Sequence, residues 1–273
     1  MVELSKFYKI GKLKLNVASA YSITPLLAYK LKASSKANAE SDPSNFFHCP
    51  FNAIVNVPSD GWCLIYAFQM AYFIEYGVKY KIEYIFKRLV ASYLSFIACD
   101  DNLNFAVLQQ SNLGKVLGYR EETRDNLLLT SKYQLVQYVL SKRFGSELVD
   151  FIPKLIADAF SCVITVYEYD AFREELVTDN YRTFLPFIRT EHHSKSTKCV
   201  NILYLRKSSH YFALTVTNCT HDRVDYIKLS NLIVDMNELF FCFCQHENEF
   251  NGILKNLTSS KLCHFIISLS LSL

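Results

Sequence analysis

The sequence predicts an α+β protein in which most helices precede most strands. Apolar residues recur at helical spacing in two successive segments, residues 63–75 and 80–98. After Phe160 the chain becomes rich in β-branched and aromatic residues, which favour strands. Only 7 glycines and 6 prolines interrupt a chain that is 51% hydrophobic, so we expect a substantial packed core.

Each further element follows from a local pattern. Helical spacing also covers residues 133–144 and 153–160, and the second segment begins with Pro153, which suits a first helical turn. We expect strands at residues 162–169, 200–205 and 210–217. Residues 218–222 have the composition of a turn and predict an antiparallel hairpin with a further strand at 223–229.

Charge and hydropathy exclude two classes of function. The 29 basic residues are spread beside 26 acidic ones, for a net charge of +3, so there is no dense positive stripe of the kind that binds nucleic acid. The apolar stretch at residues 262–273 is interrupted by His264 and serines and is shorter than the ~20 residues that span a bilayer. We therefore expect neither a nucleic-acid partner nor a membrane span.

Polar composition predicts the domain organisation. Residues 32–45 (KASSKANAESDPSN) are small and polar, which indicates a linker or long loop. We therefore expect an N-terminal extension and linker at residues 1–45, one domain at 46–230 and a C-terminal extension at 231–273. Residues 1–15 lack the apolar core of a secretory signal, so we expect the nine cysteines to be reduced thiols of a cytoplasmic protein.

A candidate nucleophile stands at the start of the first predicted helix. Residues 58–61 predict a turn that ends where the amphipathic helix begins, near Cys63. Unpaired backbone N–H groups and the helix dipole favour a thiolate there, and the same N–H groups can bind an oxyanion. Gly61 lets the turn adopt backbone angles closed to other residues and allows a substrate carbonyl to approach.

A candidate general base stands at the start of a predicted strand. Histidine is the side chain best suited to exchange a proton with a thiol near neutral pH. Of seven histidines, only His210 heads a well-formed apolar strand, where a sheet can fix the ring while its tip stays exposed. The pair Cys63 and His210 therefore predicts nucleophilic thiol chemistry.

These two segments resemble the ovarian-tumour (OTU) family of cysteine proteases. Residues 60–68 (DGWCLIYAF) resemble the family's nucleophile motif, and Ser209, His210 and Tyr211 resemble its catalytic His-Tyr. The similarity covers about residues 52–217. It implies a papain-type fold with a central, mostly antiparallel sheet packed between helices. It also implies a deubiquitinase without cofactor, acting on ubiquitin or a ubiquitin-like protein.

The chain departs from the family pattern at two positions. Phe212 stands where many members carry an Asp or Asn that orients the histidine. In some viral members the Asp three residues before the nucleophile takes that role, so we expect Asp60 to orient His210, unless it is only a turn residue. Trp62 replaces a smaller residue, and we expect it to line the substrate cleft with Gly61 and Tyr211 while partly buried.

Three alternatives stay open at this point. One is a viral-type protease that cuts a polyprotein in the host cytoplasm, and another is an inert OTU-like module that binds ubiquitin, suggested by Phe212 and Trp62. The third is a zinc site near the end of the chain. We expect no metal there, because the spacing is not a usual zinc spacing and the surrounding phenylalanines indicate core. The candidate ligands are Cys242, Cys244, His246, Cys263 and His264.

Overall fold

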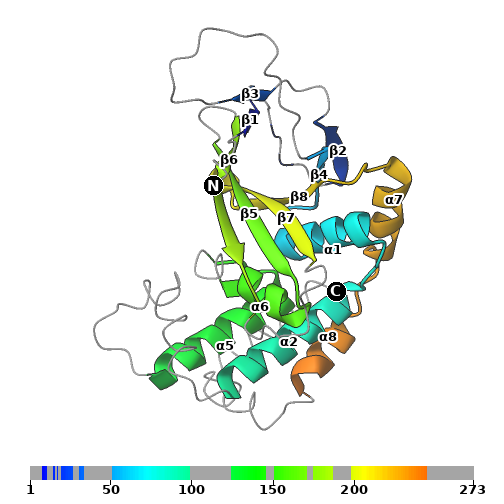
Figure 1. Ribbon diagram of the computed structural model, residues 1–273. Coiled ribbons are helices and arrows are strands. Elements are labelled where there is room, and N and C mark those ends of the chain that lie inside the picture. The colour runs from blue at the N-terminus through cyan, green and yellow to red at the C-terminus, as the bar shows by residue number, and fades with distance from the viewer. Residues whose placement is uncertain are drawn as a thin grey trace. The chain divides into compact units, whose positions relative to one another are not determined.

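A computed structural model gives a mixed α+β architecture, which confirms the predicted fold class (Figure 1). It describes residues 8–10, 15, 17, 20–26, 31–33, 51–98, 124–145, 151–170, 175–186 and 198–244. The chain divides into two compact units. The first comprises Met1–Tyr80, Val163–Phe184 and Ser194–Leu232, and the second comprises Lys81–Cys162, Leu185–His193 and Ile233–Leu273.

The described strands form one mostly antiparallel sheet in the first unit, as the sequence predicts. Its order is β2-β4-β8-β7-β5-β6-β1-β3, and the single parallel pair among these strands is β5 with β7. The strands are β1 (Tyr8–Ile10), β2 (Ser22–Pro25), β3 (Leu31–Ala33), β4 (Ala53–Asn56), β5 (Val163–Asp170), β6 (Glu175–Phe184), β7 (Cys199–Leu205) and β8 (His210–Thr215).

Strands β4, β8 and β7 lie side by side, and every residue of β8 is buried. In the register of this group His210 pairs with Leu205, Phe212 with Leu203 and Val55 with Ala213. His210 is therefore the first residue of a strand that is hydrogen-bonded on both sides. A short 3₁₀ turn, η3 (Arg206–Ser208), connects β7 to β8.

The N-terminal segment supplies strands at both ends of the sheet. Strand β2 pairs with β4 in a register that places Ser22 opposite Asn56, whereas β1 pairs with β6 and with β3. The sheet thus includes strands from both sides of the expected boundary at residue 45. Of the expected linker, Lys32 and Ala33 belong to β3, and residues 34–45 lie outside the described residues.

Helix α1 (Cys63–Tyr76) packs against β8, β7 and β4. Its first ten residues are all buried, because the sequence is apolar on every side of the helix. The helix ends at Gly77, whose φ of 69° is in the left-handed region and whose N–H donates to the Phe73 carbonyl. The predicted helix at 63–75 is thereby confirmed.

The predicted strand at residues 223–229 is wrong, because this segment forms helix α7 (His221–Ser230). The extended Thr220 precedes it, Asp222 occupies its first turn, and Val224 and Ile227 are buried at a spacing of three residues. That spacing puts both apolar side chains on one helical face toward α1. Arg223 fixes the contact, since its Nη1 donates to the Ile74 carbonyl at 3.0 Å.

A pair of hydrogen-bonded amides anchors the end of α7 to α1. Gln69 of α1 donates from Nε2 to Asn231 Oδ1 at 3.0 Å, and Asn231 Nδ2 donates back to Gln69 Oε1 at 2.6 Å. Gln69 also donates to the Tyr80 carbonyl at 2.6 Å. Each polar group of these two amides is therefore hydrogen-bonded, which matters most for Gln69 because it is 1% exposed.

The described helices of the second unit confirm the predicted helical segments. Arg88 Nε donates to the Ala159 carbonyl at 3.0 Å, Ser92 bonds Asp158 at 2.9 Å, and the Tyr93 hydroxyl bonds Ser131 at 2.7 Å. None of the helices in the described ranges combines the length and apolar character needed to cross a membrane. These helices are α2 (Ile82–Ala98), α5 (Arg124–Ser141), α6 (Phe151–Ala159) and α8 (Met236–Cys244).

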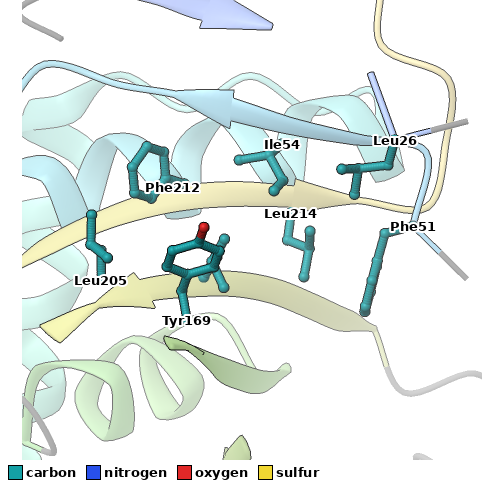
Figure 2. Close-up of a cluster of buried hydrophobic side chains, with 8 residues drawn as sticks. Leu26, Phe51, Ile54, Tyr169, Leu205, Phe212 and Leu214 are labelled. Carbon is teal, nitrogen blue, oxygen red and sulfur yellow. The ribbon is translucent and has the colours of Figure 1, made fainter. Parts of the chain in front are cut away.

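A cluster of buried apolar side chains covers one face of the central strands. Alternation along β8 puts His210, Phe212 and Leu214 on this face and Tyr211 and Ala213 on the other. Figure 2 shows the cluster in front of the strands, with α1 behind them. The cluster comprises Leu26, Phe51, Ile54, Tyr169, Leu203, Leu205, Phe212 and Leu214.

Phe212 is therefore a core residue, and its truncation will test this placement. Only 1% of Phe212 is exposed, so Phe212→Ala is expected to lower the free energy of unfolding by about 3–5 kcal/mol through lost burial and a cavity. Urea denaturation measures the change. Leu229→Ala is the control, since Leu229 is 66% exposed and its truncation should cost less than about 0.5 kcal/mol. Equal losses in both variants contradict the placement.

Candidate active site

A tight turn delivers Cys63 to the first position of α1. Asp60 Oδ1 accepts a hydrogen bond from the Trp62 N–H at 3.1 Å, which closes the turn over Gly61. Gly61 has a φ of 99°, a conformation that side chains with a Cβ rarely adopt. The Tyr66 N–H then donates to the Trp62 carbonyl at 3.0 Å as the first helical bond. The predicted helix start at Cys63 and the predicted special backbone conformation of Gly61 are confirmed.

The Cys63 thiol lies against the backbone at the start of β8. Its Sγ donates to the Ser209 carbonyl at 4.0 Å. Burial raises the pKa of the Cys63 thiol to about 11, although backbone N–H groups of Tyr211 and Leu64 lower it. Only 4% of Cys63 is exposed, so desolvation outweighs the helix terminus, and the thiol form prevails at neutral pH. The expected thiolate is therefore not the ground state in this structure.

His210 is held by partners on its own side of the sheet. Its Nε2 lies 3.1 Å from Asn56 Oδ1, and its ring meets Phe212 edge-on, with centroids 4.6 Å apart at 88°. Burial lowers the pKa of His210 to about 4, and a hydrogen bond to the Val57 backbone raises it in part. The ring is 1% exposed, so the expectation of an exposed tip is wrong.

Cys63 and His210 meet at the same point of the fold but from opposite faces of the sheet. The thiol comes from α1 on one face, whereas the ring shares the other face with Phe212. Sγ contacts the backbone of Ser209 and Tyr211, on either side of His210, and it is not hydrogen-bonded to the ring. Nucleophile and base pairs are commonly looser in unliganded enzymes and tighten with substrate.

Asp60 does not occupy the orienting position expected for it. Its carboxylate accepts hydrogen bonds from the Trp62 N–H and, at 3.1 Å, from the Tyr66 hydroxyl. Burial and the Asp60 charge both raise the pKa of Tyr66, which keeps this hydroxyl protonated as a donor. The ring of His210 bonds Asn56 instead. Asp60 is not available to the ring because the Trp62 N–H and the Tyr66 hydroxyl bind its oxygens on the thiol's side of the sheet.

Two residues expected to line a substrate cleft are buried. Trp62 is 1% exposed and packs edge-on against Tyr66, with ring centroids 6.3 Å apart. Tyr211 is 0% exposed and stacks on Tyr204 at 4.6 Å. In this form of the protein, neither aromatic ring can contact a substrate. Of the three residues expected there, Gly61 alone is partly exposed.

Asn56 is the residue of this site that sequence reasoning missed. It is the last residue of β4, a strand that the periodicity did not reveal because it is short and its first three residues are all apolar. The available signal was an amide closing the apolar run at residues 53–55 just before a turn at Pro58. Asn56 is 4% exposed and belongs to the same buried face as His210.

The residues that the structure describes contain no group of three or more His, Cys, Asp and Glu side chains that could hold a metal ion. The five zinc candidates near the end of the chain all have side chains outside the described part.

No protein-family model matches this chain, and no curated protein matches its sequence. Its function is therefore inferred from the two motifs and from the contacts that surround Cys63 and His210.

The closed geometry predicts how the Cys63 thiol reacts in the free protein. Because burial raises its pKa to about 11, its alkylation by iodoacetamide should be slow at pH 7 and rise about tenfold per pH unit toward pH 11. Peptide mapping by mass spectrometry measures the rate, with the exposed Cys199 in the same digest as a reference. A Cys63 rate that levels off below pH 8 contradicts the prediction.

Proposed function

We propose that this chain is a thiol hydrolase that cleaves the peptide or isopeptide bond after the C-terminal glycine of ubiquitin or a ubiquitin-like protein. One observation carries the proposal: Cys63, at the first position of α1, meets the start of β8, where His210 is hydrogen-bonded to an amide. A thiol at a helix N-terminus, an imidazole and an orienting acceptor are the components of a cysteine protease. The substrate class comes from the OTU-like motifs, and the papain-type fold is part of this proposal.

The reaction proceeds through a thioester. The Cys63 thiol gives its proton to the His210 imidazole, and the sulfur bonds the glycine carbonyl carbon. Backbone N–H groups at the start of α1 stabilise the oxyanion. The imidazolium then protonates the leaving lysine amine as the C–N bond breaks. His210 next takes a proton from water, which hydrolyses the thioester and releases a carboxylate and the thiol. A cytoplasmic setting suits this chemistry, because a reducing compartment preserves the thiol.

Substrate binding has to rearrange the start of β8, because the thiol and the ring are buried and approach from opposite faces. The preceding turn is the element best able to move. The residues of this turn are exposed. Its Arg206 forms an ion pair with Glu168 at 2.6 Å, but the arginine side chain is 77% exposed, so the ion pair contributes little stability. Ser209 has a φ of 50°, a left-handed conformation that is unfavourable for a residue with a Cβ.

The same burial favours a second candidate function, an inert module that binds ubiquitin without cleaving it. In the closed form both groups are neutral at pH 7, because burial raises the pKa of Cys63 and lowers that of His210. A protein in which Cys63 and His210 stay buried would bind ubiquitin without cleaving it. Binding and labelling experiments separate the two functions.

Ubiquitin carrying a C-terminal electrophile should label the protein at Cys63. Cys63→Ala should abolish labelling and hydrolysis of a fluorogenic ubiquitin substrate with little change in thermal melting, because the thiol is the nucleophile. Cys162→Ala is the matched control, since Cys162 is also a buried cysteine but lies outside this site. Saturable ubiquitin binding without labelling would identify the inert module. If the wild-type protein neither labels nor binds ubiquitin, the proposed function fails.

Asp60→Asn should leave turnover within about threefold of wild type, because an Asn side chain makes the same turn bond to the Trp62 N–H. Steady-state kinetics of the fluorogenic substrate measure the change. A loss of about a hundredfold or more would restore the orienting role to Asp60, as expected for an acid that holds a catalytic histidine.

A further inference from the structure

We propose that Asn56 is the positioning residue of the site and holds the His210 ring with its proton on Nε2, which leaves Nδ1 as the basic nitrogen. The catalytic consequence rests on the proposed function, whereas the protonation of the ring is a property of the free protein. Three independent features of the fold carry the inference.

The first feature is the fixed orientation of the Asn56 amide. Its Nδ2 donates to the Ala20 carbonyl at 3.0 Å, just before strand β2. The pairing of β2 with β4, which sets Ser22 opposite Asn56, brings this carbonyl into place. An amide has donors at one end and an acceptor at the other, so the partners decide which end faces which neighbour. With Nδ2 committed to Ala20, the acceptor Oδ1 faces the ring.

The second feature is that His210 meets this acceptor through Nε2, at 3.1 Å. A neutral imidazole has a single N–H, and only the nitrogen that carries it can donate to a carbonyl oxygen. Burial lowers the pKa of His210 to about 4, so the ring is neutral at pH 7. The bond to Asn56 therefore places the proton on Nε2. The Val57 backbone is a competing acceptor, and a ring protonated at Nδ1 would contradict the assignment.

The third feature is that the pair is buried and packed from the side. Asn56 is 4% exposed and His210 is 1% exposed, so water does not compete for their hydrogen bond. Phe212 lies edge-on against the ring and limits its rotation. The position where many OTU proteins carry a polar orienting residue thus provides packing here, and the polar contact comes from β4.

An amide orients the ring without adding charge. A carboxylate in its place would stabilise the imidazolium and raise the pKa of His210, whereas Asn56 leaves it low. Burial is the main cause of this low pKa, and β4 carries no titratable side chain. Several titratable side chains stand on or next to the other elements packed against β8. They are Cys63, Tyr66, Tyr72, Glu75 and Tyr76 of α1 and Cys199 and Tyr204 of β7, with Asp60 in the preceding turn.

Nitrogen NMR of the histidine side chains tests the protonation state directly. His210 is assigned by the signal missing in His210→Gln, and its neutral ring should be protonated at Nε2 in the wild-type protein at pH 7. Asn56→Leu, which keeps volume but removes the acceptor, should shift the ring toward Nδ1 protonation. Asn52→Ala is the matched control, because Asn52 bonds the Val216 carbonyl and not the ring.

Kinetics test the positioning role. Asn56→Leu should lower kcat by about 10- to 100-fold with little change in KM, as for other residues that orient a functional histidine. Asn56→Asp keeps an acceptor and should recover most of kcat. Because its carboxylate favours the imidazolium, the His210 limb of the pH–rate profile should move to higher pH. Asn52→Ala should match wild type in both respects.

The two experiments separate failure of the inference from failure of the proposed function. A wild-type protein without ubiquitin hydrolase activity overturns the proposed function, and the NMR measurement still decides the inference. A wild-type ring protonated at Nδ1, or wild-type turnover in a folded Asn56→Leu protein, overturns the inference. If Asn56→Leu does not fold, the wild-type NMR spectrum and the Asn56→Asp profile decide it.

Discussion

The packing of the buried helix α1 against β8 is the contact on which the rest of the site depends. It places the first residue of the helix against the backbone that flanks His210, so that two distant parts of the chain meet. The turn at Gly61 fixes where the helix begins, and the buried strand fixes where the histidine stands. A change that displaces α1 therefore displaces the thiol relative to every other group of the site.

The same packing creates a conflict between burial and chemistry. A helix N-terminus favours a thiolate, and a base near a thiol favours the ion pair, but removal of water favours the neutral form of each group. In the closed form removal of water dominates, as the raised pKa of Cys63 and the lowered pKa of His210 both indicate. The proposed hydrolysis therefore requires a rearrangement that brings the Cys63 thiol and the His210 ring to the substrate.

The residues that support His210 come from the part of the chain before Cys63. Asn56 comes from β4, and the carbonyl that orients its amide comes from the segment before β2. Ala20, which the sequence alone assigns to an N-terminal extension, thus orients the residue that binds the candidate base. This arrangement also explains why Phe212 is tolerated two residues after His210, since the polar contact is made elsewhere and the position is free to join the core.

The sequence by itself determined the elements whose signals are local. The apolar run after Gly61 begins a helix at Cys63, and the β-branched and aromatic runs form β5, β7 and β8, because spacing and turn chemistry act over a few residues. Tertiary structure decided the rest. The bond between Asn56 and His210 joins residues 154 positions apart, and only the register of the sheet brings them together. Helix α7 depended on burial of Val224 and Ile227 against α1. The pKa values of Cys63 and His210 depended on desolvation, which is a property of the packed fold and not of any segment.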